Sequence, residues 1–198
     1  MTEQALLVMD LQTEIIGRYG DEALTLLERV NEATSAARSN GIPVIYVRVA
    51  FREGAPEVSS RNSSFMEAAK SGTRSELSPG TQIHPSIAPK ENDIIVTKRR
   101  VSAFAGSDLD VVLRSLGVTS LVLMGIATRG VVLSTVRQAA DLDFTLTVLR
   151  DGCYDLDPEV DHVLLDKIFP RQALVLTTGE WIASLVPGSA SASGNRSH

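Results

Sequence analysis

The stretch from Leu121 to Thr135, LVLMGIATRGVVLST, constrains the fold of this chain more than any other. Leu121 to Met124 is an unbroken apolar run that ends at Gly125, and such runs are typical of strands buried on both faces of a parallel sheet. Small residues follow, and a helical pattern begins near Gly130. A strand that enters a helix through a tight turn leaves backbone N–H groups directed at its carboxyl end. The stretch therefore predicts a site there for an anion or a developing oxyanion.

The rest of the chain alternates between strand and helix patterns. Five further strands are predicted, at Ala5–Met9, Pro43–Val49, Asp93–Thr97, Phe144–Leu149 and Ala173–Leu176. Helices are predicted over Asp21–Asn40, Phe65–Lys70, Ser107–Leu116, Gly130–Asp141, Asp157–Ile168 and Thr178–Leu185. Because buried strands alternate with helices, we expect an α/β fold: a three-layer α/β/α, Rossmann-like sandwich with a six-stranded parallel sheet.

One domain accounts for most of the chain. Its 198 residues are enough for a full core, which we expect to occupy residues 1–186. Residues 187–198 are rich in glycine and serine, and this composition predicts a disordered tail. The polar connection from Ala50 to Asn92 is typical of a functional loop or a partner surface. Within it, Ser64 and Glu67 fit a capping box for the short helix.

Composition excludes several classes of function. A net charge of −5 without a dense basic cluster argues against binding to nucleic acid or to an anionic membrane surface. No apolar run approaches the roughly 20 residues that span a bilayer. The amino terminus lacks a basic region and its apolar run is interrupted by Asp10, so it does not fit a signal peptide. A single cysteine, Cys153, is typical of a reducing compartment, and we expect a cytoplasmic protein.

Charged residues follow two of the predicted strands. Asp10 ends the first strand and Lys98 ends the third, and ligands of such sheets bind beyond the carboxyl ends of the strands. If the two side chains converge, Lys98 lowers the pKa of Asp10 and the pair can carry out acid–base chemistry. The alternative is that both charges only mark strand ends, and the residues alone leave both interpretations open.

Three separated motifs resemble the isochorismatase-like family of hydrolases, which includes nicotinamidases, other amidohydrolases and isochorismatases. They are LLVMDLQ at 6–12, TKRRVSAFAGSDLDVVLRSLGVTSLVLMGIAT at 97–128 and TVRQAADLDFTLTVLRDGC at 135–153. The resemblance covers residues 5–177 and is weakest in the loop from Ala50 to Asn92. It implies a six-stranded parallel sheet between helices, in agreement with the fold predicted above.

The resemblance also implies a catalytic triad that this chain does not complete. In the cysteine hydrolases of the family the triad is Asp, Lys and Cys, and the first two correspond to Asp10 and Lys98. The family motif Gly-x-x-Thr-Asp-x-Cys-Val, laid on Gly125, places Arg129 at the Asp and Val131 at the cysteine. We therefore expect a member that lacks the catalytic cysteine, with Val131 at its position.

No other residue is a convincing replacement for that nucleophile. Cys153 is expected to be a small buried residue after the fifth strand, and Ser134 to project deeper along its helix. Thr128 lies in the turn but has no base apart from Asp10.

The backbone of the turn can still bind an oxyanion. The resemblance implies a cis peptide between Ile126 and Ala127, which directs the N–H groups of Ala127 and residue 131 at one point. Valine supplies a backbone N–H as well as cysteine does. We predict that the oxyanion and substrate site is lined by Ala127, Thr128, Arg129, Gln12 and Phe51.

Neither a metal nor another cofactor is expected. Nicotinamidase-like members carry an Asp and several His residues after the second strand, whereas this chain reads VRVAFREG there. Its histidines, His84, His162 and His198, are not at ligand spacing from one another.

Three functions stay open. The first is a cysteine-independent hydrolase of the isochorismatase type, with Asp10 as general acid and Lys98 and Arg129 as cations for a small, carboxylated metabolite. The segment KRRVSAFAGSDL resembles that branch, although Val131 is bulkier than the usual Gly and Arg129 replaces the usual His. The second is a non-catalytic small-molecule binder or regulatory subunit. The third is an amidohydrolase that uses water activated by Asp10.

Self-association is implied by the resemblance, because members of this family usually form dimers or tetramers. We expect a homodimer or homotetramer, with Phe51, Phe65 and Met66 of the long loop as the contact surface. Arg99 and Arg100 are expected to be solvated, with one of them able to face an anionic ligand.

Overall fold

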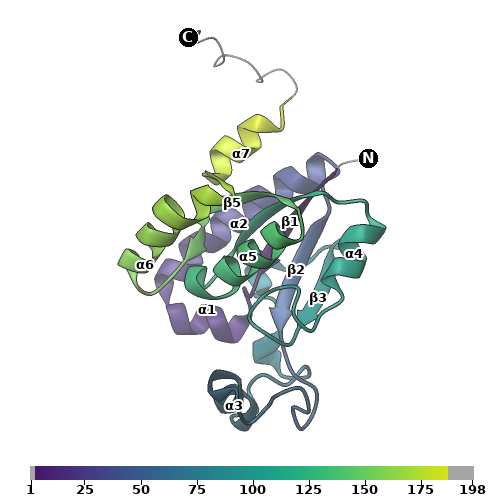
Figure 1. Cartoon of the computed structure of the whole chain (residues 1–198), viewed down its shortest axis with the longest axis vertical. Helices are drawn as coiled ribbons and strands as arrows, with labels where there is room; N and C mark the ends of the chain where they lie inside the picture. The colour runs from purple at the N-terminus through teal and green to yellow at the C-terminus, as the bar shows by residue number, and fades with distance from the viewer. Residues whose placement is uncertain (1–2, 187–198) are drawn as a thin grey trace.

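Six parallel strands form one sheet, in the order β3-β2-β1-β4-β5-β6, in the computed structural model of this chain (Figure 1). The strands are β1 (Gln4–Met9), β2 (Val44–Val49), β3 (Ile94–Lys98), β4 (Ser120–Ile126), β5 (Thr145–Tyr154) and β6 (Leu174–Leu176). The structure describes residues 3–186, so the tail predicted at 187–198 lies outside the described residues.

Seven α-helices connect or follow these strands: α1 (Thr13–Tyr19), α2 (Asp21–Ser39), α3 (Ser63–Lys70), α4 (Leu109–Ser115), α5 (Leu133–Asp141), α6 (Pro158–Val163) and α7 (Thr178–Ser184). A π-helical turn, η3 (Thr128–Val132), joins β4 to α5. Further short turns are η1 (Pro79–Thr81), η2 (Pro85–Ile87), η4 (Leu164–Ile168) and η5 (Phe169–Arg171). No helix among residues 3–186 is long and apolar enough to cross a membrane.

Two hydrophobic cores flank the sheet. Side chains alternate along β1, so Leu7 and Met9 enter one core while Leu6 and Val8 enter the other. The first core is completed by α4, α5 and α6, and the second by α1, α2 and α7. The predicted three-layer α/β/α sandwich is confirmed.

The strand order reverses between β1 and β4, which places the ligand-binding end of the sheet at these two strands. Gly125 is required there by close packing. A Cβ on this residue would lie 2.2 Å from the carbonyl oxygen of Met9, and its φ is +151°. Only glycine lets β4 approach the end of β1 in this way.

The sequence missed or misplaced several elements. It did not predict α1, where only Ile15 and Ile16 are buried, too few to give a helical period. The capping box at Ser64 was wrong: Asn62 caps α3, and its side chain accepts a hydrogen bond from the N–H of Phe65. The predicted helix from Gly130 is instead η3 followed by α5.

The fifth strand is longer than predicted. It runs to Tyr154 through the polar pair Arg150 and Asp151, where the sequence pattern suggested an end. The pairing shifts register between the pairs Leu123–Val148 and Gly125–Cys153, where the extra residues lie on β5, and the strand then continues. Cys153 consequently lies on β5 opposite Gly125, not after the strand.

Candidate active site

Asp10 and Lys98 meet at the carboxyl end of the sheet. Lys98 is the last residue of β3, and Asp10 follows β1, with only β2 between the two strands. Asp10 has a left-handed backbone (φ +58°), and its N–H donates to the carbonyl oxygen of Val47 at 2.8 Å. The ammonium Nζ of Lys98 lies 2.8 Å from Oδ2 of Asp10. The structure thus brings together two charges that are distant in sequence.

The two oxygens of the Asp10 carboxyl differ in their surroundings. Lys98, whose side chain is 2% exposed, binds Oδ2 and also donates to the carbonyl oxygens of Arg100 and Val101 at 3.0 and 2.7 Å. Oδ1 is buried and has no hydrogen-bond partner among the described residues. Burial raises the pKa of Asp10, and the charges of Lys98 and Arg74 only partly oppose this. Oδ1 is therefore the atom left available to exchange a proton.

Asp10 lines two neighbouring cavities. The first has a volume of about 410 Å³, includes Lys98 and has Val49, Phe65 and Val101 as apolar wall. The second, of about 330 Å³, is lined by Ile15, Tyr19, Ile126, Ala127 and Leu156. Volumes in this range suit small metabolites. Of the residues predicted for the site, Asp10, Lys98 and Ala127 are brought together here.

Two cations that the sequence did not single out line both cavities, Arg18 of α1 and Arg74 of the long loop. Tyr19 was also missed, and it lines the second cavity. The three lie on an unpredicted helix and in a loop without periodicity, so no local pattern marks them. Only the fold places them at the strand ends.

The turn after β4 contains the cis peptide that the family resemblance implied. The Ile126–Ala127 peptide is cis. The carbonyl oxygen of Ala127 accepts hydrogen bonds from the N–H groups of Gly130 and Val132, at 3.0 and 3.4 Å. These bonds close the turn directly behind the strand.

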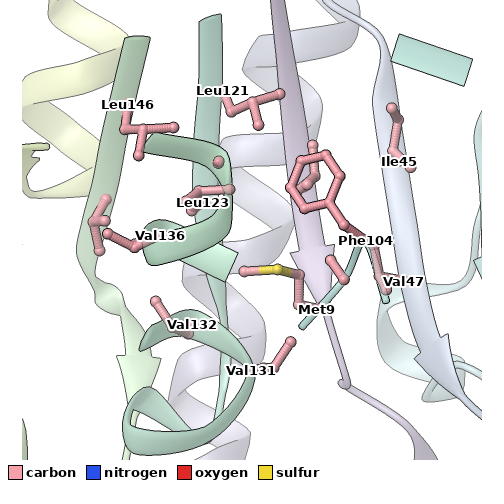
Figure 2. Packing of buried hydrophobic residues seen from close by; sticks show 14 of the residues in the cluster. Met9, Ile45, Val47, Phe104, Leu121, Leu123, Val131, Val132, Val136 and Leu146 are labelled. Atoms are coloured by element: carbon pink, nitrogen blue, oxygen red, sulfur yellow. The ribbon is translucent and has the colours of Figure 1, made fainter. Parts of the chain in front are cut away.

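Val131, at the predicted position of the missing cysteine, lies in the core. It is 2% exposed and belongs to the same hydrophobic cluster as Met9 and Phe104 (Figure 2). It does not line either of the two cavities at Asp10. Apolar packing therefore occupies position 131.

Arg129, predicted as a cation for the substrate, is bound to a carboxylate of the protein. Its guanidinium lies 3.2 Å from Oδ1 of Asp155, and its backbone N–H donates to Oδ2 at 3.1 Å. Asp155 is fully buried, and its own N–H donates to Asp161. Burial raises the pKa of Asp161, and the hydrogen bond from the Asp155 N–H opposes this shift. The contacts of Arg129 with Asp155 thus hold the turn in place.

Gln12 joins three parts of the chain. Its side-chain nitrogen donates to the carbonyl oxygens of Val49 and Thr81 at 2.9 and 3.0 Å. Its side-chain oxygen accepts from the N–H of Val49 at 2.8 Å. The side chain is 2% exposed. The amide predicted to face substrate is consequently used to fix the long loop against β2.

Replacing Gln12 by leucine is expected to lower the free energy of unfolding by about 1–3 kcal/mol, because buried backbone groups of Val49 and Thr81 lose their partners. Urea unfolding followed by circular dichroism measures the change. Gln82→Leu is the control, since this exposed glutamine of the same loop makes longer hydrogen bonds. Equal effects of both substitutions would contradict the role given to Gln12.

Phe51 is internal. It is 1% exposed, and its ring packs edge-on against Phe65 with the ring centroids 5.6 Å apart. Its assignment to a contact surface was wrong, because the loop folds back over it. Phe65 and Met66 are half-buried, and assembly into a homodimer or homotetramer stays a prediction.

Arg99 and Arg100 are not solvated as predicted. The Arg99 guanidinium donates to the carbonyl oxygen of Ala50 and pairs with Glu57 and Glu76, and its side chain is 12% exposed. Arg100 donates to the carbonyl oxygen of Glu57 at 2.6 Å and lies over the Phe65 ring. The two arginines fasten the long loop to the end of β3, beside Lys98.

Among the side chains described within residues 3–20 and 23–186, no group of three or more His, Cys, Asp and Glu could hold a metal. His162 pairs with Asp166 at 2.7 Å, and the ring of His84 accepts a hydrogen bond from the N–H of Ser86. Cys153 is buried, and burial raises the pKa of its thiol. A thiol held in the neutral form is a poor nucleophile.

Comparison with known proteins places these observations in a family. The isochorismatase domain matches residues 4–180. The chain is 31% identical to YwoC of Bacillus subtilis (strain 168), an uncharacterized isochorismatase family protein, over 90% of this chain and 92% of the relative. It is also 31% identical to the ureidoacrylate amidohydrolase RutB of Stutzerimonas stutzeri (strain A1501), over 80% of this chain and 72% of the relative.

Solved structures agree with the fold. A cysteine hydrolase from Pseudomonas syringae pv. phaseolicola 1448A superposes with a TM-score of 0.86 at 22% identity, covering 93% of this chain and 94% of the other. An isochorismatase family protein from Burkholderia thailandensis gives a TM-score of 0.77 at 27% identity, covering 93% and 97%. The α/β/α fold is common to this chain and these structures.

Proposed function

Because this chain belongs to the isochorismatase family of hydrolases, we propose that it hydrolyses a small metabolite without a cysteine nucleophile, using Asp10 to transfer the proton. The observation that supports this most directly is the Asp10–Lys98 pair. It leaves Oδ1 of a carboxyl with a raised pKa beside two cavities of small-molecule size. A buried carboxyl of this kind keeps its proton to a higher pH than an exposed aspartic acid does, and it is therefore suited to donate that proton.

The chemistry that fits a proton donor without a nucleophile is hydrolysis of an enol ether, as in isochorismatases. Oδ1 of Asp10 gives its proton to the terminal carbon of the C=C bond, and the ether carbon becomes an oxocarbenium ion. Water adds to this carbon and returns a proton to the Asp10 carboxylate. The resulting hemiketal breaks its C–O bond to release a ketone and an alcohol. No covalent bond to the protein forms at any step, so a valine at position 131 is compatible with the reaction.

Lys98 has a positioning role in this proposal. Its ammonium is held by two backbone carbonyls as well as by Oδ2, so it cannot swing into the cavity without losing both. Holding Oδ2 leaves Oδ1 as the proton donor and stabilises the carboxylate once the proton has left.

Amide hydrolysis is a second candidate, favoured by the identity to ureidoacrylate amidohydrolases. In this reaction ionised Asp10 would take a proton from water, and the hydroxide would attack the amide carbon. Asp10 would then return the proton to the nitrogen as the C–N bond breaks and the amine leaves. The buried Oδ1 is again the reacting atom, but Asp10 must be deprotonated first.

Two assays separate these reactions from a purely binding role. The purified protein is incubated with isochorismate and pyruvate is measured, and with ureidoacrylate and other small amides while ammonia is measured. Pyruvate release supports the proposal, and ammonia release supports the second candidate. Binding of either substrate without turnover would contradict both and favour a non-catalytic binder.

The pH dependence distinguishes an acid from a base at Asp10. Since burial raises the pKa of Asp10, its protonated form persists above the usual range of an aspartic acid. For the enol ether reaction we expect kcat/KM to be highest below this pKa and to fall as the pH rises through it. An amide reaction would give a rate that rises through the same pKa. Steady-state rates between pH 4 and 9, with circular dichroism to verify folding, measure the direction.

A further inference from the structure

Arg18 and Arg74 form the common wall of the two cavities at Asp10. Arg18 belongs to the last turn of α1, whereas Arg74 belongs to the loop between β2 and β3. The first cavity extends from this wall toward Phe65, and the second toward Tyr19. A ligand in either cavity would contact both arginines.

Arg74 is a cation with no counter-ion among the described side chains. Its Nε is buried with no hydrogen-bond partner, and its guanidinium makes no ion pair with the side chains described within residues 3–20 and 23–186. Two other partly buried arginines have carboxylate partners: Arg38 binds Asp93 at 2.6 Å, and Arg99 binds Glu76. Glu67 also lines the first cavity, but it is exposed and forms no ion pair with Arg74. A buried donor without a partner is costly unless a ligand binds it.

The backbone of Arg74 is held in place although it lies in a long loop. Its carbonyl oxygen accepts a hydrogen bond from the N–H of Phe51 at 2.7 Å, and Ser75 forms a parallel bridge with Phe51. The N–H of Glu76 donates to the carbonyl oxygen of Phe51 at 2.9 Å. Phe51 directly extends β2, so Arg74 is fixed to the end of the sheet.

The positive charge of Arg74 acts on the pKa of Asp10, the proposed proton donor. Burial raises the pKa of Asp10 and of Tyr19, and in both cases the positive charge of Arg74 acts in the opposite direction. The other two cations of the cavities are already paired, Lys98 with Asp10 and Arg18 with Glu14. Arg74 is therefore the charge that remains for a ligand.

We propose that Arg74, assisted by Arg18, is an anion subsite that selects substrates carrying a carboxylate. A guanidinium offers parallel N–H donors that match the two oxygens of a carboxylate. Because the arginines lie at the junction of both cavities and beside Asp10, the carboxylate binds close to the reacting bond and the rest of the substrate extends into one cavity. This inference rests on the proposed function, since it identifies the substrate class of the same site.

The test compares ligands that differ only in charge. Benzoate is paired with benzamide and propionate with propionamide, and each is titrated calorimetrically into the protein at pH 7.5 and constant ionic strength. We expect at least one carboxylate to bind more tightly than its amide. Arg74→Gln should weaken that binding by about 10- to 100-fold, the usual effect of losing a charge-assisted pair, and leave the amide unaffected. Arg74→Lys should retain part of the preference.

Matched arginines serve as controls. Arg18→Gln should weaken carboxylate binding less than Arg74→Gln, because Arg18 is exposed and paired with Glu14. Arg114→Gln removes a similarly exposed arginine, paired with Asp110 on α4, and should change nothing. If no carboxylate binds better than its amide, or if a folded Arg74→Gln protein keeps the preference, the inference is overturned.

Binding without turnover keeps this test separate from the proposed reaction. Asp10→Asn should bind the carboxylate at least as tightly as the unmodified protein, because a neighbouring negative charge is removed. Carboxylate selectivity without any turnover by the unmodified protein would therefore count against the proposed chemistry alone. Turnover of neutral substrates with no role for Arg74 would count against the subsite alone.

Discussion

Asp10→Asn is expected to lower kcat by about 10²- to 10⁴-fold on the substrate that the protein hydrolyses, because an amide cannot donate the proton that Oδ1 carries. The substitution is nearly isosteric, and the amide oxygen can still accept a hydrogen bond from Lys98. Substrate binding should persist. Pre-steady-state and steady-state rates, with affinities from calorimetry, measure kcat apart from binding.

A control must show that the loss comes from this carboxyl and not from the removal of an aspartate in general. Asp110→Asn is suitable, since its partly exposed carboxylate pairs with Arg114 on the surface of α4. It should leave kcat unchanged. If Asp10→Asn retained full turnover while Asp110→Asn behaved as expected, Asp10 could not be the proton donor.

Lys98→Met is expected to have the largest effect on stability. The substitution leaves the Asp10 carboxylate buried without its partner, and it also removes the donor to the carbonyl oxygens of Arg100 and Val101. Breaking one side of a buried ion pair typically costs about 3–5 kcal/mol, because the remaining charge stays desolvated. Urea unfolding at pH 7.5 measures this loss in the free energy of unfolding.

A double variant shows whether the loss of stability in Lys98→Met comes from the unpaired charge of Asp10. Asp10→Asn combined with Lys98→Met contains neither buried charge, so it should be more stable than Lys98→Met alone. Lowering the pH should also reduce the loss in the free energy of unfolding of Lys98→Met. Without Lys98, the pKa of Asp10 in the folded protein rises further above its unfolded value, so stability is retained at low pH and lost as the pH rises through the folded pKa. Additive losses that do not change with pH would show that Lys98 acts through packing only.

Local sequence patterns were enough to predict the sheet and the end of it at which Asp10 and Lys98 lie. The apolar runs of β1 and β4, and the charged residues that end or follow β1 and β3, are local features, and they correctly indicated six parallel strands with Asp10 and Lys98 at one edge. Helix α1 was missed because two buried residues do not make a period. The predicted end of β5 was wrong because polar residues continue this strand where its pairing with β4 shifts register.

Side-chain direction could not be inferred in this way. Gln12 and Phe51 follow strand ends, as site residues do, yet one binds the backbone of the long loop and the other packs beneath it. Arg129 lies in the expected turn but faces Asp155, which comes from the far end of β5. In each case a distant segment of the chain supplies the partner.

The sequence by itself determined the α/β architecture, the family to which its motifs point, and the placement of Asp10 and Lys98 at strand ends, because the carboxyl ends of parallel strands lie at one end of the sheet. Only the tertiary structure decided that these two side chains form an ion pair, that position 131 is closed by the core, and that Arg74 lies beside Asp10 with no ion-pair partner among the described side chains. The physical reason is that burial and charge pairing depend on which segments pack together. The loop from 50 to 92 acquires its place through contacts with distant residues, among them Gln12, Arg99 and Arg100.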